Sequence, residues 1–132
     1  LEVDRIQIEQ VIMNLVRNGF DAMASAPPGT RAVTLRTALD AQGRVQIEVS
    51  DRGKGVRADD LERIFEPFFT TKQTGLGMGL SISRSIAEAH SGQLSARNNA
   101  EVGATFTLAL PPRTSAAGEA QPSATAAGGA AR

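Results

Sequence analysis

The chain has 132 residues, of which 41% are hydrophobic, so its length and composition are those of one folded domain. It contains no cysteine and one histidine, which excludes disulfide bonds, thiolate metal sites and a multi-histidine metal site. Lysine plus arginine and aspartate plus glutamate both number 14, and this zero net charge argues against a basic nucleic-acid-binding surface or a polybasic membrane patch.

Helix and strand patterns alternate along the chain and predict an α/β fold. An amphipathic helix is expected over residues 4–24, with Asp4 as its N-cap and Gln7 three residues further on, as in a capping box. Short turns join most of the strands, so the sheet should be mixed and mostly antiparallel, with the helices on one face. The other expected elements are strands at 31–39 and 45–50, a hairpin turn at 40–44, a glycine-rich loop at 51–58, a short helix near 59–64, a loop at 65–76, a helix at 79–90, and strands near 93–98 and 103–110.

The composition changes after Pro111 and Pro112. Residues 113–132 contain no Val, Ile, Leu, Met or Phe and are rich in alanine and glycine. A segment without large apolar side chains cannot offset its ordering entropy, so a disordered tail is predicted there. An alanine-driven helix is the alternative, which Pro122 and the glycines weaken. We therefore expect a folded domain over residues 1–112.

The first helix carries a polar stripe opposite its apolar face. Within this stripe Asn14 and Asn18 lie four residues apart, and asparagine is a poor residue inside a helix, which indicates that the two carboxamides are used. A carboxamide oxygen is a hard ligand that suits Mg²⁺. A solvated helix face is the alternative interpretation. The stripe spans an arc of about 100° and consists of Gln10, Asn14, Arg17, Asn18 and Asp21.

Asp51 follows the strand at 45–50, in which apolar and polar residues alternate, and by parity its carboxylate lies on the apolar face. A carboxylate on the core side needs a partner, and as an acceptor it suits an amino group such as the exocyclic amine of adenine. Gly53 and Gly55 allow the backbone to approach a ligand closely. An aspartate that only caps its own turn is the alternative.

A second glycine cluster, Gly75, Gly77 and Gly79, precedes the helix that begins near Leu80. Backbone N–H groups at a helix N-terminus bind anions, so a phosphate-binding lid is predicted there, with a merely flexible loop as the alternative. The spacing fits neither a Walker P-loop nor a dinucleotide fingerprint. The phenylalanines just upstream are expected either to pin the lid to the body or to form a structural aromatic cluster; they are Phe65, Phe68 and Phe69.

In this order the motifs resemble those of the catalytic ATP-binding domain of sensor histidine kinases, in the wider family that includes gyrase B, Hsp90 and MutL. The similarity covers nearly all of residues 4–110. The lid and the Gly-Leu-Ser-Ile-Ser run look most like the oxygen- and nitrogen-sensing type of kinase. The matching segments are the N box at 10–22, the first glycine box at 51–55, the F box at 65–72, the second glycine box at 75–80 and a last Gly-Ala-Thr-Phe motif at 103–106.

The resemblance implies a two-layer α/β sandwich of the Bergerat type that binds ATP and Mg²⁺. Asn18 would ligate Mg²⁺, with Asn14 beside it on the phosphates or on a metal-bound water, and both would be catalytic residues. Asp51 would bind the adenine amine. The base pocket would be completed by Gly53, Gly55 and Thr105, and the candidates for holding the phosphates are Arg17 (our own addition), Thr71, Lys72, Gly75, Leu76, Gly77, Gly79 and Leu80.

The acceptor histidine of this family lies in a separate dimerising helical hairpin. His90 is expected at the end of the second helix and does not match the acceptor motif. The resemblance therefore implies that the full-length protein passes the γ-phosphate to a histidine of a dimerisation domain, with a response regulator downstream, and that this fragment does not autophosphorylate. It implies a cytoplasmic domain without membrane or nucleic-acid contact. Relatives usually have a strand before the position of Leu1, so either the sequence begins after that strand or an edge strand is lost, which would leave a sheet edge exposed.

Three other functions remain open from the sequence. A serine kinase of the anti-sigma-factor type is disfavoured by the long phenylalanine-rich lid and by asparagine, not glutamate, at position 14. A gyrase- or Hsp90-like ATPase would need a glutamate there to activate water, and Asn14 is a poor base. The third is a nucleotide-binding regulatory module without catalysis.

Overall fold

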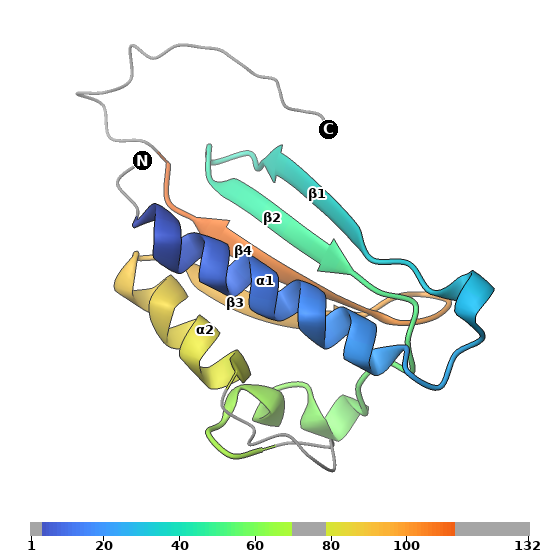
Figure 1. Cartoon of the computed structure of the whole chain (residues 1–132). Helices are drawn as coiled ribbons and strands as arrows, with labels where there is room; N and C mark the ends of the chain where they lie inside the picture. The colour runs from blue at the N-terminus through green and yellow to red at the C-terminus, as the bar shows by residue number, and fades with distance from the viewer. Residues whose placement is uncertain (1–3, 70–78, 113–132) are drawn as a thin grey trace.

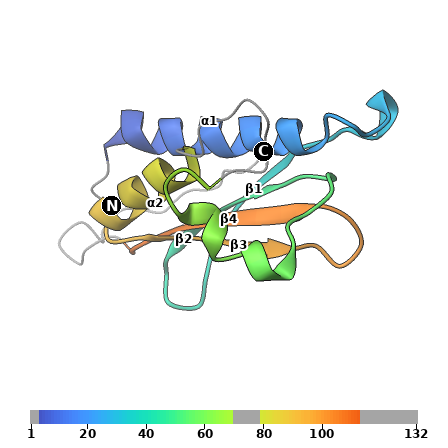
Figure 2. The ribbon, with the colours of Figure 1, turned by 90° about the horizontal axis from the view of Figure 1, so that it is seen from below.

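The computed structural model describes residues 4–69 and 79–112. In these residues two helices, α1 (Arg5–Ala22) and α2 (Gly79–Ala89), cover one face of a four-stranded sheet (Figure 1). Viewed from below, the helices form one layer and the sheet the other (Figure 2). The remaining elements are β1 (Thr34–Leu39), β2 (Val45–Ser50), β3 (Gln93–Asn98), β4 (Ala104–Leu110) and three short 3-10 turns at Pro28–Thr30, Ala58–Asp60 and Arg63–Phe65.

The strand order is β1-β2-β4-β3, and every pairing among the described residues is antiparallel. This confirms the predicted two-layer α/β fold and its mostly antiparallel sheet. The short helix expected near 59–64 is instead a pair of 3-10 turns. The expected tail at 113–132 lies outside the described residues. Within the described part of the chain, no helix is long and apolar enough to cross a membrane.

The β1–β2 hairpin closes through the side chain of Asp40. Its carboxylate accepts from the N–H groups of Gln42 and Arg44 and contacts the Arg44 guanidinium at 2.7 Å, while Gly43 supplies the left-handed turn residue, with φ of 82°. Desolvation tends to raise the pKa of Asp40, but the hydrogen bonds from Arg44, Gln42 and Gln46 outweigh it and lower the pKa below its usual 3.8. The carboxylate therefore stabilises the hairpin near neutral pH, and less so as the pH falls below about 4.

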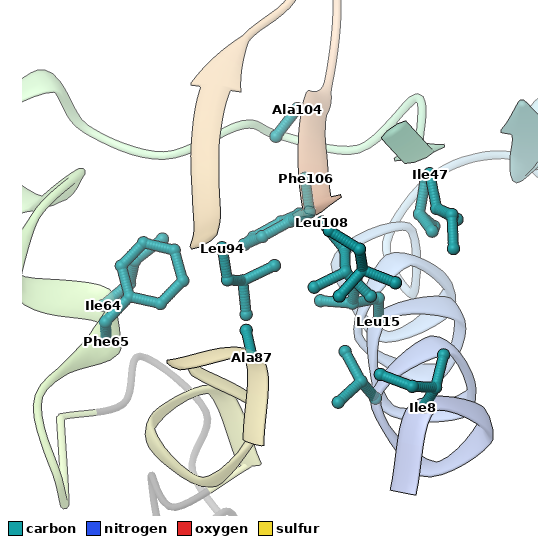
Figure 3. Close-up of a cluster of buried hydrophobic side chains, with 13 residues drawn as sticks. Ile8, Leu15, Ile47, Ile64, Phe65, Ala87, Leu94, Ala104, Phe106 and Leu108 are labelled. Carbon is teal, nitrogen blue, oxygen red and sulfur yellow. The ribbon is translucent and has the colours of Figure 1, made fainter. Parts of the chain in front are cut away.

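The core lies between the two layers, where the alternation of β2 and β4 turns apolar side chains toward the helices (Figure 3). Leu15 of α1 and Leu108 of β4 are fully buried there. Phe65 joins the core edge-on to Phe106, with ring centroids 6.4 Å apart, whereas Phe68 is 73% exposed. Of the three phenylalanines expected to pin the lid, Phe65 is therefore a core residue and Phe68 is not.

The start of α1 is tied to the end of α2 by His90. Asp4 caps α1 as predicted, because its Oδ1 accepts from the N–H groups of Ile6 and Gln7 at 3.0 and 3.2 Å. The second half of the predicted capping box is wrong: the Asp4 N–H donates to Nε2 of His90 at 3.0 Å, not to Gln7. The other ring nitrogen, Nδ1, lies 2.8 Å from the Ile86 carbonyl and must carry the proton, because a carbonyl only accepts.

Replacing His90 by alanine is expected to lower the free energy of unfolding by about 1–2 kcal/mol, because two hydrogen bonds are lost. The bond from the Asp4 N–H joins the two helices, and the bond to the Ile86 carbonyl closes the end of α2. Urea unfolding followed by circular dichroism measures this change. Gln7→Ala is the matched control and should cost less than about 0.5 kcal/mol. Equal losses of unfolding free energy for the two variants would favour the predicted capping box and contradict the hydrogen bond between Asp4 and His90.

Candidate functional site

Asp51 lies at the end of β2 on the helix-facing side of the sheet, and its side chain is 4% exposed. Its Oδ1 accepts from the backbone N–H groups of Gly53 at 2.8 Å and of Ala104 at 3.3 Å. Within the described residues no hydrogen bond reaches Oδ2. The carboxylate thus points inward as predicted, and one of its oxygens has no donor in the part of the chain that the structure describes. Such an acceptor fits a ligand that brings an amino group.

The loop after Asp51 packs backbone against backbone on the C-terminal half of α1. A Cβ on Gly53 would lie 2.6 Å from the Ala22 carbonyl oxygen, so no side chain fits at that position. A Cβ on Gly19 would lie 3.2 Å from the Val33 side chain and 3.4 Å from the Cβ of Asp51. The lack of a side chain at Gly19 therefore lets α1 come close to the carboxylate.

Two asparagines that the sequence reasoning did not single out hold this loop. Asn98 donates from Nδ2 to the Val56 carbonyl at 2.6 Å and accepts from the Val56 N–H at 2.8 Å. A Cβ on Gly55, whose φ is 77°, would lie 2.8 Å from Oδ1 of Asn98. Asn99 donates to the Asp51 carbonyl at 3.2 Å. The sequence does contain a sign of this role, because two adjacent asparagines stand at the end of a predicted strand. Asparagine side chains often form hydrogen bonds with the backbone of turns.

Thr105 does not share the site with the Asp51 carboxylate. It pairs with Ser50 across β2 and β4, and cross-strand partners lie on the same face of a sheet. That face points away from the helices. The Thr105 hydroxyl lies 2.6 Å from that of Ser50 and donates to Oδ1 of Asn99 at 2.5 Å. The β4 residue on the same side as the Asp51 carboxylate is Ala104. Thr105 is therefore not placed to contact the base, although the sequence predicted that contact.

Asn14 and Asn18 lie one turn apart on α1 and are both half-buried, whereas Arg17 is exposed. Nδ2 of Asn14 donates to the hydroxyl of Ser83 on α2 at 2.8 Å. Asn18 makes no hydrogen bond within the described residues. The predicted pair is therefore not a freely solvated face: one carboxamide bridges the helices, and the other is half-buried and has no partner among residues 4–69 and 79–112.

The first turn of α2 lies close to the carboxamide of Asn14. A Cβ on Gly79 would lie 2.8 Å from Oδ1 of Asn14, so the glycine leaves room for it. Leu80 is half-buried and packs against the core. The expected lid residues Thr71, Lys72, Gly75, Leu76 and Gly77 lie outside the described residues.

The carboxamide oxygens of Asn14 and Asn18 on α1 suit a hard cation whose other ligands are oxygen atoms of water or of a bound molecule. Carboxamide oxygens suit Mg²⁺, which usually keeps several waters and shares phosphate oxygens with a nucleotide. No group of three or more His, Cys, Asp or Glu side chains in the described residues could hold a metal by itself. Two carboxamide oxygens would leave most of the coordination positions of such a cation to water or to phosphate oxygens.

The features line up along α1. Asn14 lies beside the first turn of α2, Asn18 is one turn further along, and Asp51 packs at Gly19. Gly19 lies five positions after Asn14, which is about 8 Å along a helix axis. A two-layer α/β domain that brings a buried amine acceptor and the hard oxygens of two carboxamides together along the C-terminal half of one helix has the arrangement of a class, the nucleotide-binding domains.

Comparison with known proteins places the chain within that class. Residues 3–114 match the family model described as histidine kinase-, DNA gyrase B- and HSP90-like ATPase. The chain belongs to this family. This confirms the relationship that the motifs indicated.

Relatives with assigned names are sensor kinases. The chain is 50% identical over 108 residues to the sensor protein FixL of Bradyrhizobium diazoefficiens, which covers 82% of this chain and 21% of FixL. The catalytic domain of histidine kinase ThkA superposes with a TM-score of 0.72 at 36% identity, covering 84% of this chain and 70% of that one. Full-length ShkA in complex with AMPPNP superposes with a TM-score of 0.68 at 28% identity, covering 80% and 21%. The chain thus spans about a fifth of FixL.

Proposed function

We propose that this domain binds Mg²⁺·ATP and, in the full-length protein, supplies the γ-phosphoryl group to a histidine on a separate dimerisation domain. The observation that carries the proposal is the buried Asp51 carboxylate, of which one oxygen is held by backbone N–H groups and the other has no donor among the described residues. The similarity to ShkA, which was solved with AMPPNP, supports nucleotide binding at the equivalent fold.

Each group has a place along α1 in this proposal. Asp51 accepts from the adenine amine and so selects the base. The carboxamide oxygen of Asn18 would hold the metal, with Asn14 beside it on the phosphates or on a metal-bound water, and the metal would neutralise charge on the phosphates. Arg17, Lys72 and Thr71 are proposed as further phosphate contacts, together with the glycines at 75, 77 and 79 and Leu76 and Leu80 beside them. The work of the domain is then mostly positioning and charge neutralisation.

The transfer step needs a group that this chain does not supply. The bond between the γ-phosphorus and the β–γ bridging oxygen breaks, a phosphorus–nitrogen bond to the acceptor imidazole forms, and ADP leaves. The proton that the imidazole loses would pass to a base beside the acceptor histidine on the dimerisation domain. His90 is not proposed as the acceptor, because both of its ring nitrogens are engaged with Asp4 and Ile86. Partners are therefore the dimerisation domain and, downstream, a response regulator.

The test mixes the chain with a separate helical hairpin that carries an acceptor histidine, and adds γ-labelled ATP with Mg²⁺. Label on the hairpin histidine, stable to base and labile to acid, is the expected result. Label on serine would favour an anti-sigma-factor type of kinase, and release of phosphate alone would favour a gyrase- or Hsp90-like ATPase. Tight nucleotide binding with neither outcome would favour a regulatory module.

A further inference from the structure

Ser83 lies in the second turn of α2, 2% exposed, with its hydroxyl turned toward α1. Its Oγ accepts a hydrogen bond from Nδ2 of Asn14 at 2.8 Å. The contact joins residues 69 positions apart and bridges the two helices beside the proposed metal site. Buried hydroxyls and amides in such positions are normally paired, so the bond fixes both side chains.

The direction of this bond decides which end of the carboxamide faces the site. A carboxamide has a donating nitrogen and an accepting oxygen, and only the oxygen can ligate a cation. Because Nδ2 is held by Ser83, Oδ1 is the end that remains available, and no hydrogen bond among the described residues occupies it. Gly79 leaves room for this orientation, since any Cβ there would lie 2.8 Å from Oδ1.

We infer that Ser83 is a positioning residue, which holds the Asn14 carboxamide with its oxygen turned toward the metal of bound Mg²⁺·ATP. The inference rests on the proposed function and extends it to a residue on α2. Partners of this kind orient metal ligands, and their removal typically lowers metal affinity about tenfold or more. Ser83 itself touches neither metal nor nucleotide in this account, and acts through Asn14.

A double-mutant cycle separates this role from simple packing. The affinity of the full chain for a non-hydrolysable ATP analogue is measured with Mg²⁺ and with EDTA for wild type, Ser83→Ala, Asn14→Ala and the double variant. Ser83→Ala is expected to lower the affinity about tenfold in Mg²⁺ and by less than about twofold in EDTA. In the Asn14→Ala background it should cause no further loss, because the two residues act as one unit.

Two further variants complete the design. Ser83→Thr keeps the hydroxyl and should restore the Mg²⁺-dependent affinity, while Ser85→Ala removes an exposed hydroxyl from the same helix and should leave it unchanged. Equal losses with Mg²⁺ and with EDTA, or additive losses in the double variant, would overturn the inference and leave Ser83 a packing residue. A wild type that binds no nucleotide would overturn the proposed function, and this inference with it.

A measurement without nucleotide keeps the test independent of binding. The side-chain amide resonances of Asn14, assigned by their loss in Asn14→Ala, should shift in Ser83→Ala and stay near the wild-type position in Ser83→Thr. Thermal unfolding of each variant shows whether the fold is kept. Unchanged Asn14 resonances in a folded Ser83→Ala protein would contradict the contact itself.

Discussion

Replacing Asp51 by asparagine is expected to lower the affinity for ATP about 100-fold while the fold is kept. The retained oxygen still accepts from the N–H groups of Gly53 and Ala104, but an amide nitrogen replaces Oδ2 and faces the adenine amine, donor against donor. Sites built around one hydrogen bond reject a mismatched partner by factors of about 100 or more, because buried polar groups are left unpaired. Isothermal titration with a non-hydrolysable ATP analogue measures the loss.

The same variant has a second signature. Inosine triphosphate carries a carbonyl where ATP carries the amine, so Asp51→Asn should bind it better than wild type does. Asp59→Asn is the matched control, because Asp59 lies in the following 3-10 turn and its side chain is 88% exposed. The affinity of this variant for ATP should equal that of the wild type. Undiminished ATP binding by Asp51→Asn would contradict the assignment of the base pocket.

Gly103→Ala is expected to lower the free energy of unfolding by about 3 kcal/mol. Gly103 has a φ of 88°, which L side chains rarely adopt, and a Cβ there would lie 2.0 Å from the Asp51 carbonyl oxygen. Relief of that clash must move backbone, and the backbone concerned carries both Asp51 and the Ala104 N–H that it binds. The variant should therefore lose stability and nucleotide affinity together, as followed by urea unfolding and titration.

Gly29→Ala provides the control for Gly103. A Cβ on Gly29 meets nothing within 4 Å, and this residue lies in the 3-10 turn Pro28–Thr30. Its substitution should change the free energy of unfolding by less than about 0.5 kcal/mol. A loss below about 1 kcal/mol for Gly103→Ala would mean that the backbone around Asp51 yields easily.

The elements that the sequence predicts well are those set by local periodicity. The helix expected at 4–24 and the strand at 45–50 are observed as α1 and β2, and strand parity placed Asp51 on the inner face correctly. Apolar side chains recur with a clear period in these segments, and packing between the layers then fixes which side is buried.

Local sequence patterns could not predict the contacts between residues that lie far apart in the chain. The Asp4 N–H donates to His90, 86 positions away, and not to Gln7, the partner that the capping-box pattern predicted. Thr105 falls on the far face of the sheet because faces alternate residue by residue, so an error of one position moves a side chain to the other side. The Asn14–Ser83 bond likewise depends on how α1 and α2 pack.

One measurement tests the central claim most directly: isothermal titration of the wild-type chain with a non-hydrolysable ATP analogue, in Mg²⁺ and in EDTA. We predict saturable one-to-one binding that is clearly tighter in Mg²⁺, because in the proposed site Asn18 would hold a metal that comes with the phosphates, with Asn14 beside it. Absence of binding, or equal affinity with and without the metal, would contradict a Mg²⁺·ATP site formed by Asp51 and the two asparagines of α1.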